Sequence, residues 1–255
     1  MPYYDLGDLT NYIINNFYSI DWKTKLDKLK SIIYGLESIH HENIVHGDLH
    51  SGNIFFNDIS DRIINDVVIG DLGMSKAVES NDDNENYGII SYMAPELFQE
   101  QKYSKASDIY SFGMIMWEFM TGRRPFWDRI HDTELIIEIC DGLRPPIITN
   151  APEGYIDLMK KCWHSDSDKR PTAFDIFHYK IDEIIKNEKN PTKIIPSSDI
   201  GPITNNPGAI YKSRPLGDTI RSAMSVMSSK SQSTTLNELF FHYQKSYIFI
   251  RKKKV

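Results

Sequence analysis

Residues 44–56 read IVHGDLHSGNIFF, and residues 67–73 read VVIGDLG. Short apolar runs rich in β-branched and aromatic residues flank a polar loop in the first stretch, and a carboxylate follows the apolar run of the second. The loop contains Asp48 and Asn53, and Asp71 ends the second run. Magnesium prefers oxygen ligands and keeps several waters, so Asn53 and Asp71 at neighbouring strand ends would suit a magnesium–phosphate site. Asp48 is then left to accept or orient a proton.

Three short motifs follow one another in a characteristic order. They are His-x-Asp-x4-Asn at residues 46–53, Asp-x-Gly at 71–73 and Ala-Pro-Glu at 94–96. This order resembles the catalytic loop, the metal loop and the end of the activation segment of protein kinases. The runs at 92–96, 162–163 and 170–171 lean towards the tyrosine-kinase-like group. The resemblance covers residues 1–186.

The resemblance implies a mainly α fold, namely the C-terminal, large lobe of a protein kinase over residues 1–186. A few short β-strands would surround the catalytic loop, and the N-terminal lobe would be absent. Apolar residues recur at helical spacing over 21–39 and fill 107–122 nearly all round, which predicts an amphipathic and a buried helix. Further amphipathic helices are predicted at 133–140, 155–164 and 172–185.

The composition changes after residue 186. Residues 187–235 are crowded with Asn, Pro, Ser, Thr and Lys, and apolar residues are scattered. Such a segment buries too little apolar surface to offset its ordering entropy, so we predict a disordered Ser/Asn/Pro-rich tail over 187–255. Its end is aromatic and basic, and no function is assigned to it.

The resemblance gives each polar residue of the catalytic loop a role. Asp48 would accept or orient the proton of the acceptor hydroxyl, and Asn53 and Asp71 would bind magnesium. His50 stands where serine/threonine kinases carry a Lys near the γ-phosphate, and it would offer a hydrogen bond more than a fixed charge. The alternative for these residues is turn formation, which Asp and Asn favour. Gly47 replaces an Arg that reads an activation-loop phosphate in the family, so control by that route is not expected.

The first residues resemble the kinase hinge, where an extended backbone binds adenine. The resemblance implies that backbone groups of Pro2 and Tyr4 contact the adenine and that the Asp8 carboxylate contacts the ribose. Capping of a helix is an equally good explanation of Asp8. Phe55 would form an apolar floor beneath the adenine, or it is a core residue of its strand. Because the sequence contains no Gly-rich loop and no Val-Ala-Ile-Lys strand, we expect at most half of a nucleotide site.

Two further residues match structural positions of the family. Glu96 would form an ion pair with Arg170, and Asp108 would hold the catalytic loop by accepting its backbone N–H groups. Both roles are structural, and both follow from the resemblance.

Composition excludes several classes of protein. A net charge of −6 and a pI near 5.8 give no basic footprint for nucleic acid. The two cysteines have no metal-binding or disulfide spacing, which favours a reducing, cytoplasmic compartment. The first eight residues carry no signal-peptide pattern, and no apolar stretch is long enough for a membrane span.

The sequence therefore predicts an ATP- and Mg²⁺-dependent protein kinase that transfers the γ-phosphate to a protein hydroxyl, Ser/Thr rather than Tyr. We expect a truncated chain with weak or no activity of its own. The alternative is a pseudokinase-like interaction module without phosphoryl transfer. The sequence gives no indication of the substrate protein or of the oligomeric state.

Overall fold

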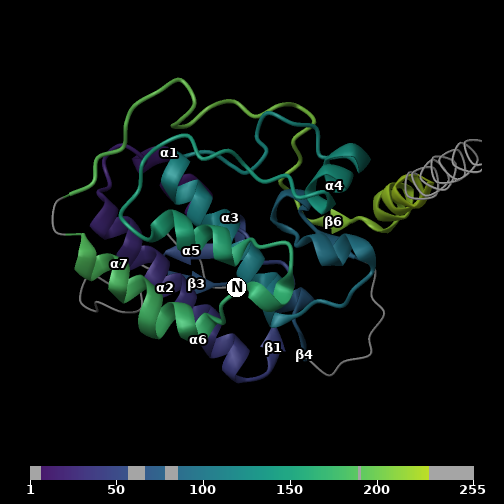
Figure 1. Ribbon diagram of the computed structural model, residues 1–255, viewed down its shortest axis with the longest axis horizontal. Helices are drawn as coiled ribbons and strands as arrows, with labels where there is room; N and C mark the ends of the chain where they lie inside the picture. Colours follow the sequence, from purple (N-terminus) through teal and green to yellow (C-terminus); the bar gives the residue numbers. More distant parts are fainter. Residues whose placement is uncertain (1–6, 57–66, 78–85, 189–190, 230–255) are drawn as a thin grey trace, which may run out of the picture.

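A computed structural model describes residues 7–56, 67–77, 86–188 and 191–229 (Figure 1). The centre of the fold is helix α3 (Lys105–Thr121), which is buried from Ser107 to its end. The helix begins at Ser104, whose side chain forms a reciprocal capping box with Ser107. It ends at Gly122, which has a φ of +73° and where a Cβ would lie 2.6 Å from the ring of Phe17. Glycine is required there by both the backbone and the packing.

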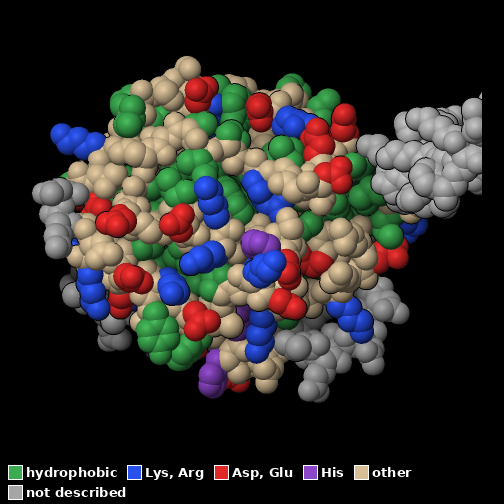
Figure 2. Space-filling model, in the orientation of Figure 1, with side chains coloured by type: hydrophobic (Ala, Val, Ile, Leu, Met, Phe, Trp, Pro, Cys, Tyr) green, Lys and Arg blue, Asp and Glu red, His purple; other side chains and the backbone are tan. Residues whose placement is uncertain are grey.

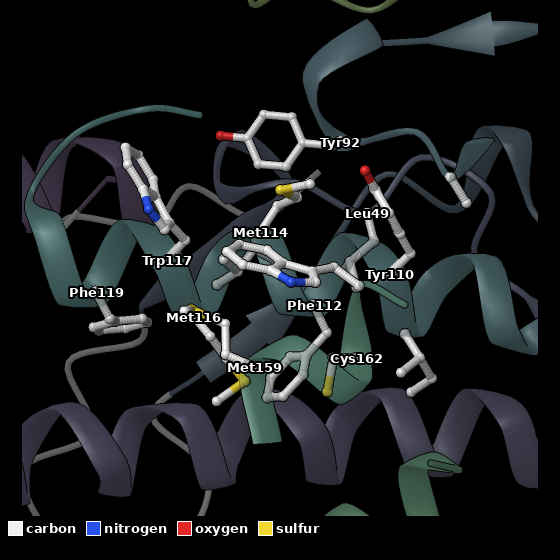
Figure 3. Close-up of a cluster of buried hydrophobic side chains, with 14 of the residues drawn as sticks. Leu49, Tyr92, Tyr110, Phe112, Met114, Met116, Trp117, Phe119, Met159 and Cys162 are labelled. Atoms are coloured by element: carbon white, nitrogen blue, oxygen red, sulfur yellow. The ribbon is translucent and has the colours of Figure 1, made fainter. Parts of the chain in front are cut away.

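The core forms where α3 meets α2 (Trp22–His41) and α5 (Tyr155–Cys162). Figure 3 shows apolar side chains of α3 packed around Met159 and Cys162 of α5. The α3 members of this cluster are Tyr110, Phe112, Met114, Met116, Trp117 and Phe119. The predicted all-round apolar helix is therefore confirmed as the core helix.

Helix α2 presents its apolar stripe to the same core. Asp21 caps it by accepting a hydrogen bond from the backbone N–H of Thr24. Its buried side chains include those at the predicted helical spacing, which are Trp22, Leu26, Leu29, Ile33 and Leu36. Helix α1 (Leu9–Asn16) precedes it and buries Leu9 and Ile13.

Short antiparallel strand pairs surround the polar loop. β1 (Ile44–Val45) pairs with β4 (Lys76–Ala77), and β2 (Ile54–Phe56) pairs with β3 (Val67–Ile69). A third pair joins β5 (Tyr87–Gly88) to β6 (Arg214–Pro215). The mainly α fold with a few short strands around the loop is confirmed.

The remaining helices lie around this core, where two of them contact α2 and the third contacts the turn at residues 95–99. They are α4 (Thr133–Cys140), α6 (Ala173–Asp175) and α7 (Ile181–Asn187), with a π-helical turn (Ile176–Lys180) between the last two. None of the helices in the described part of the chain has the length and apolar character needed to cross a membrane. Figure 2 shows basic and acidic side chains interspersed on one face.

The structure corrects the predicted disordered tail over residues 191–229. This segment lies along α1, the end of α3 and α4, and it ends in a helix over 217–229 (Figure 1). Its few apolar residues enter the core, where Ile200, Leu216, Ile220 and Ala223 are buried. Arg123 donates hydrogen bonds to the carbonyls of Ser198 and Gly201. The composition of the segment as a whole gave no sign of these few anchoring residues. The rest of the predicted tail, residues 230–255, lies outside the described part.

Candidate active site

The backbone of the loop at residues 46–48 is held by one buried carboxylate of α3. Asp108 accepts hydrogen bonds from the backbone N–H of His46 at 2.8 Å and from that of Gly47 at 3.0 Å. Its Oδ2 also lies 2.9 Å from Nε2 of His40 at the end of α2. The predicted role of Asp108 is confirmed.

His46 adds a second constraint from inside the loop. Its Nδ1 accepts a hydrogen bond from the backbone N–H of Asp48, and its Nε2 donates to the carbonyl of Gly70 at 3.0 Å. The imidazole therefore ties the loop to the residue that follows β3. Gly47 has a φ of +79°, and a Cβ there would lie 3.2 Å from the carbonyl oxygen of Met74. Arginine at this position would be strained in this loop, which gives a structural reason for the glycine.

The loop brings Asp48, His50 and Asn53 together, and each is about 8% exposed. Nδ2 of Asn53 donates to the carbonyl of Asp48 at 2.9 Å, which leaves Oδ1 as the atom that a cation would bind. Nδ1 of His50 accepts from the backbone N–H of Gly52 at 3.0 Å. Nε2 of His50 consequently faces the Asp48 carboxylate, 3.7 Å from Oδ2.

The pairing of β2 with β3 places Asp71 near the same end of the loop. Ile54 is opposite Ile69, and the backbone N–H of Gly70 donates to the carbonyl of Asn53 at 2.8 Å. Asp71 is exposed and has a left-handed backbone, with a φ of 57°. Such a conformation is uncommon outside glycine, and Asp is among the residues that tolerate it.

Asn53 and Asp71 are the two oxygen donors predicted to bind a cation at this site. Each would supply one oxygen, and phosphate and water oxygens would complete the shell. Within the residues that the structure describes, no group of three or more His, Cys, Asp and Glu side chains is placed to hold a metal ion.

The residues predicted to contact the nucleoside are only partly described. Pro2 and Tyr4 lie outside the described residues. Asp8 caps α1 by accepting from the backbone N–H of Asn11 at 2.8 Å, so its capping role is observed. Phe55 is half-buried on β2 and forms an isolated backbone bridge with Asp8. The structure thus brings Asp8 and Phe55 together, and a contact of either with adenosine stays a prediction.

The segment from Tyr92 to Glu96 is fixed by the predicted ion pair. The two guanidinium nitrogens of Arg170 donate to the two carboxylate oxygens of Glu96 at 2.6 and 2.7 Å. The side chain of Arg170 is fully buried, and it also donates to the carbonyls of Ala106 and His164. Bidentate pairs of this kind are geometrically specific, and this prediction is confirmed.

A model of the protein tyrosine and serine/threonine kinase family matches residues 1–179. The chain belongs to this kinase family. It is 33% identical over 176 residues to R831, a candidate serine/threonine-protein kinase/receptor of Acanthamoeba polyphaga mimivirus, covering 68% of this chain and 10% of the relative. It is 30% identical over 188 residues to the serine/threonine/tyrosine-protein kinase HT1 of Arabidopsis thaliana, covering 72% of this chain and 47% of that protein. The kinase chain therefore spans less than half the length of these relatives.

Sequence reasoning missed a buried hydrogen-bond network in this chain. Glu118 of α3 accepts hydrogen bonds from the hydroxyls of Ser51, at 3.1 Å, and Tyr92. Ser51 also contacts Thr10 of α1 at 2.9 Å, and Arg124 donates to the Thr10 hydroxyl. The network joins the catalytic loop, the segment before the Ala-Pro-Glu motif and two helices.

Glu118 is the unusual member of this network. Burial raises the pKa of Glu118 to about 8, although the nearby Arg124 guanidinium pulls it down. The side chain is therefore mostly protonated at neutral pH and acts as a neutral hydrogen-bonding group. The signal available in the sequence was a second carboxylate, after Asp108, within a largely apolar helix.

Proposed function

We propose that this kinase transfers the γ-phosphate of ATP to a protein hydroxyl, serine or threonine in preference to tyrosine. The observation that carries the proposal is the convergence of Asp48, His50 and Asn53 on a loop that Asp108 holds through two backbone N–H groups. Phosphoryl transfer depends mainly on positioning and on stabilisation of charge, and a fixed loop supplies the positioning.

Each residue of the loop would have a separate role in phosphoryl transfer. The Asp48 carboxylate accepts the proton of the acceptor hydroxyl, and His50 donates or accepts a hydrogen bond beside it. Asn53 and Asp71 would hold Mg²⁺ through their oxygens. When bound, Mg²⁺ and ATP supply the phosphoryl group and neutralise its charge. Asp8 and Phe55, with Pro2 and Tyr4, would bind the adenosine.

A pair of variants tests the catalytic role of Asp48. We expect Asp48→Asn to abolish phosphoryl transfer, because an amide does not accept the hydroxyl proton, while the circular dichroism spectrum stays unchanged. The loss should reach at least about 100-fold in the transfer rate, measured with radiolabelled ATP. The matched control is Asp157→Asn on the exposed face of α5, which should keep the rate of the unchanged chain. Full activity in Asp48→Asn would exclude this assignment.

The second candidate function is a pseudokinase-like interaction module, in which the large lobe transfers no phosphate. Two departures from the kinase pattern favour it, namely Gly47 in place of an Arg and His50 in place of a Lys. Calorimetry with ATP and Mg²⁺ separates the two candidate functions. ATP binding that is lost in Asp71→Ala would favour the kinase function over the interaction module. Turnover by a chain extended into the upstream coding sequence would also favour the kinase function.

We also propose that the chain belongs to the tyrosine-kinase-like group and forms a kinase C-terminal lobe. The runs at 92–96, 162–163 and 170–171 support the tyrosine-kinase-like group, and the helical architecture supports a C-terminal lobe over residues 1–186. The free thiols of Cys140 and Cys162 fit a reducing, cytoplasmic compartment.

A further inference from the structure

Residues 211–216, here named the acceptor segment, contain strand β6, which lies against the segment that leads to the Ala-Pro-Glu motif. In the β5–β6 pair, Gly88 is opposite Arg214 and Tyr87 is opposite Pro215. The backbone N–H of Leu216 then donates to the carbonyl of Asn86 at 2.8 Å. The pairing fixes the direction and the register of the acceptor segment along β5.

This register places one hydroxyl at the candidate active site. Oγ of Ser213 lies 3.3 Å from Nε2 of His50, and the same Nε2 lies 3.7 Å from Oδ2 of Asp48. A Cβ built on Gly88 would lie 3.5 Å from Oδ1 of Asp48, so β5 itself passes beside that carboxylate. Ser213 is thus separated from Asp48 by a single imidazole edge.

The acceptor segment is anchored on both sides of Ser213. On the N-terminal side, the Tyr211 hydroxyl donates to the carbonyl of Pro125 at 2.9 Å, and the Arg124 guanidinium stacks 4.3 Å above its ring. On the C-terminal side, Arg214 donates to the carbonyl of His131 at 3.1 Å, and Leu216 is 1% exposed. These contacts hold Ser213 without using its hydroxyl, which leaves the hydroxyl facing His50.

Resting on the proposed kinase function, we propose that the acceptor segment is this chain's own phosphoacceptor and that Ser213 receives the phosphate. The Ser213 Oγ bonds to the γ-phosphorus of ATP as the bond from that phosphorus to the oxygen of ADP breaks. The hydroxyl proton passes to the Asp48 carboxylate. The substrate class implied is a serine in an extended chain, followed by a basic residue, a proline and a large apolar residue.

Phosphorylation would also change what occupies the site. A phosphoserine carries close to two negative charges at neutral pH, and here it would lie beside the Asp48 carboxylate. Repulsion between the two would release the acceptor segment and free the surface beside β5 and Asp48 for another protein. Before phosphorylation, the acceptor segment lies beside Asp48 and therefore excludes other substrate proteins from that position.

The first experiment locates the phosphate. The purified chain is incubated with ATP and Mg²⁺, and phosphorylated residues are identified by mass spectrometry. We expect phosphate on Ser213, at a rate independent of protein concentration because acceptor and site share one chain. Ser213→Ala should remove this phosphate, whereas Ser222→Ala, an exposed serine of the following helix, should not.

The outcomes separate this inference from the proposed function. Phosphate on a generic basic acceptor protein, with Ser213 unmodified, would overturn the inference and leave the kinase function standing. No phosphate on any residue of either protein, from this chain and from a chain extended into the upstream coding sequence, would contradict both.

The second experiment tests occupancy without turnover. Leu216→Asp should release the acceptor segment, because a carboxylate would replace a buried apolar side chain, while the exposed Val226→Asp is the matched control. A fluorescent peptide of residues 207–219 should bind Leu216→Asp about tenfold or more tightly than it binds the control, since the tethered competitor is removed. Equal affinities for the two variants would show that this segment does not occupy the surface beside β5 and Asp48.

Discussion

At the scale of single residues, the positions that matter most are buried polar side chains. Asp108 accepts hydrogen bonds from two backbone N–H groups and contacts the His40 imidazole. Glu118 accepts hydrogen bonds from two hydroxyls. The role of Asp108 could be predicted because its helix resembles the central helix of the kinase large lobe. The state of Glu118 could not, because its pKa depends on burial and on partners that lie far away in the sequence.

Glu118→Gln should change how stability depends on pH. Burial raises the pKa of Glu118 to about 8, well above the ordinary value of a glutamate, so the folded chain keeps a proton that the unfolded chain loses. The stabilisation is complete below the unfolded value and is lost as pH rises towards the folded value. Glutamine does not titrate and keeps an accepting oxygen for Ser51 and Tyr92.

The measurement is urea unfolding of both chains between pH 5 and pH 8.5. The variant should gain about 2–4 kcal/mol in unfolding free energy relative to the original chain across this range. The two chains should be about equally stable at pH 5. A difference that does not vary with pH would mean that Glu118 is ionised in the folded chain.

At the scale of elements, helix ends and strand pairs decide where the site residues lie. α3 places Asp108 in its first turn and Glu118 in its last, and its end is fixed by Gly122 against Phe17. The sequence predicts this helix well, because an apolar run bounded by a cap and a glycine has few alternative structures. The strands are only two or three residues long, and such lengths carry too little pattern to predict their pairing.

Gly122→Ala should destabilise the chain by about 2–4 kcal/mol, because it adds a left-handed backbone penalty to a clash. The added Cβ would lie 2.6 Å from the Phe17 ring. Gly142→Ala is the matched control, since its φ is +102° but no atom lies within 4 Å of the added Cβ. Urea unfolding should give a clearly smaller loss for the control. Equal losses of stability in both variants would mean that the contact with the Phe17 ring contributes nothing to the effect of Gly122→Ala.

At the scale of the whole molecule, contacts between distant segments unite the helical domain with the segment that follows it. The ion pair of Glu96 and Arg170 joins positions 74 residues apart, and it could be predicted from the family resemblance. The packing of residues 191–229 could not. It depends on a handful of anchors, such as Ile200 and Leu216, and on backbone carbonyls that accept from Arg123.

Arg170→Met should cost about 3–5 kcal/mol of unfolding free energy, because it leaves the buried Glu96 carboxylate without its partner. The double variant Glu96→Gln with Arg170→Met should recover part of that loss, as a double-mutant cycle in urea would show. The exposed pair of Asp218 and Arg221 is the control, and Arg221→Met should cause no measurable change. Additive losses in the cycle would mean that the pair contributes no coupling.

The wrapping of residues 191–229 also bears on how this protein is shortened in the laboratory. A chain cut after residue 186, where the amino-acid usage changes, would strip the cover from the Arg123 guanidinium and from the apolar surface beneath Ile200 and Leu216. Such a fragment should aggregate and should be a poor sample for binding or kinetic work. A cut placed after Ala223, the last buried apolar side chain of the described residues, would keep that surface covered.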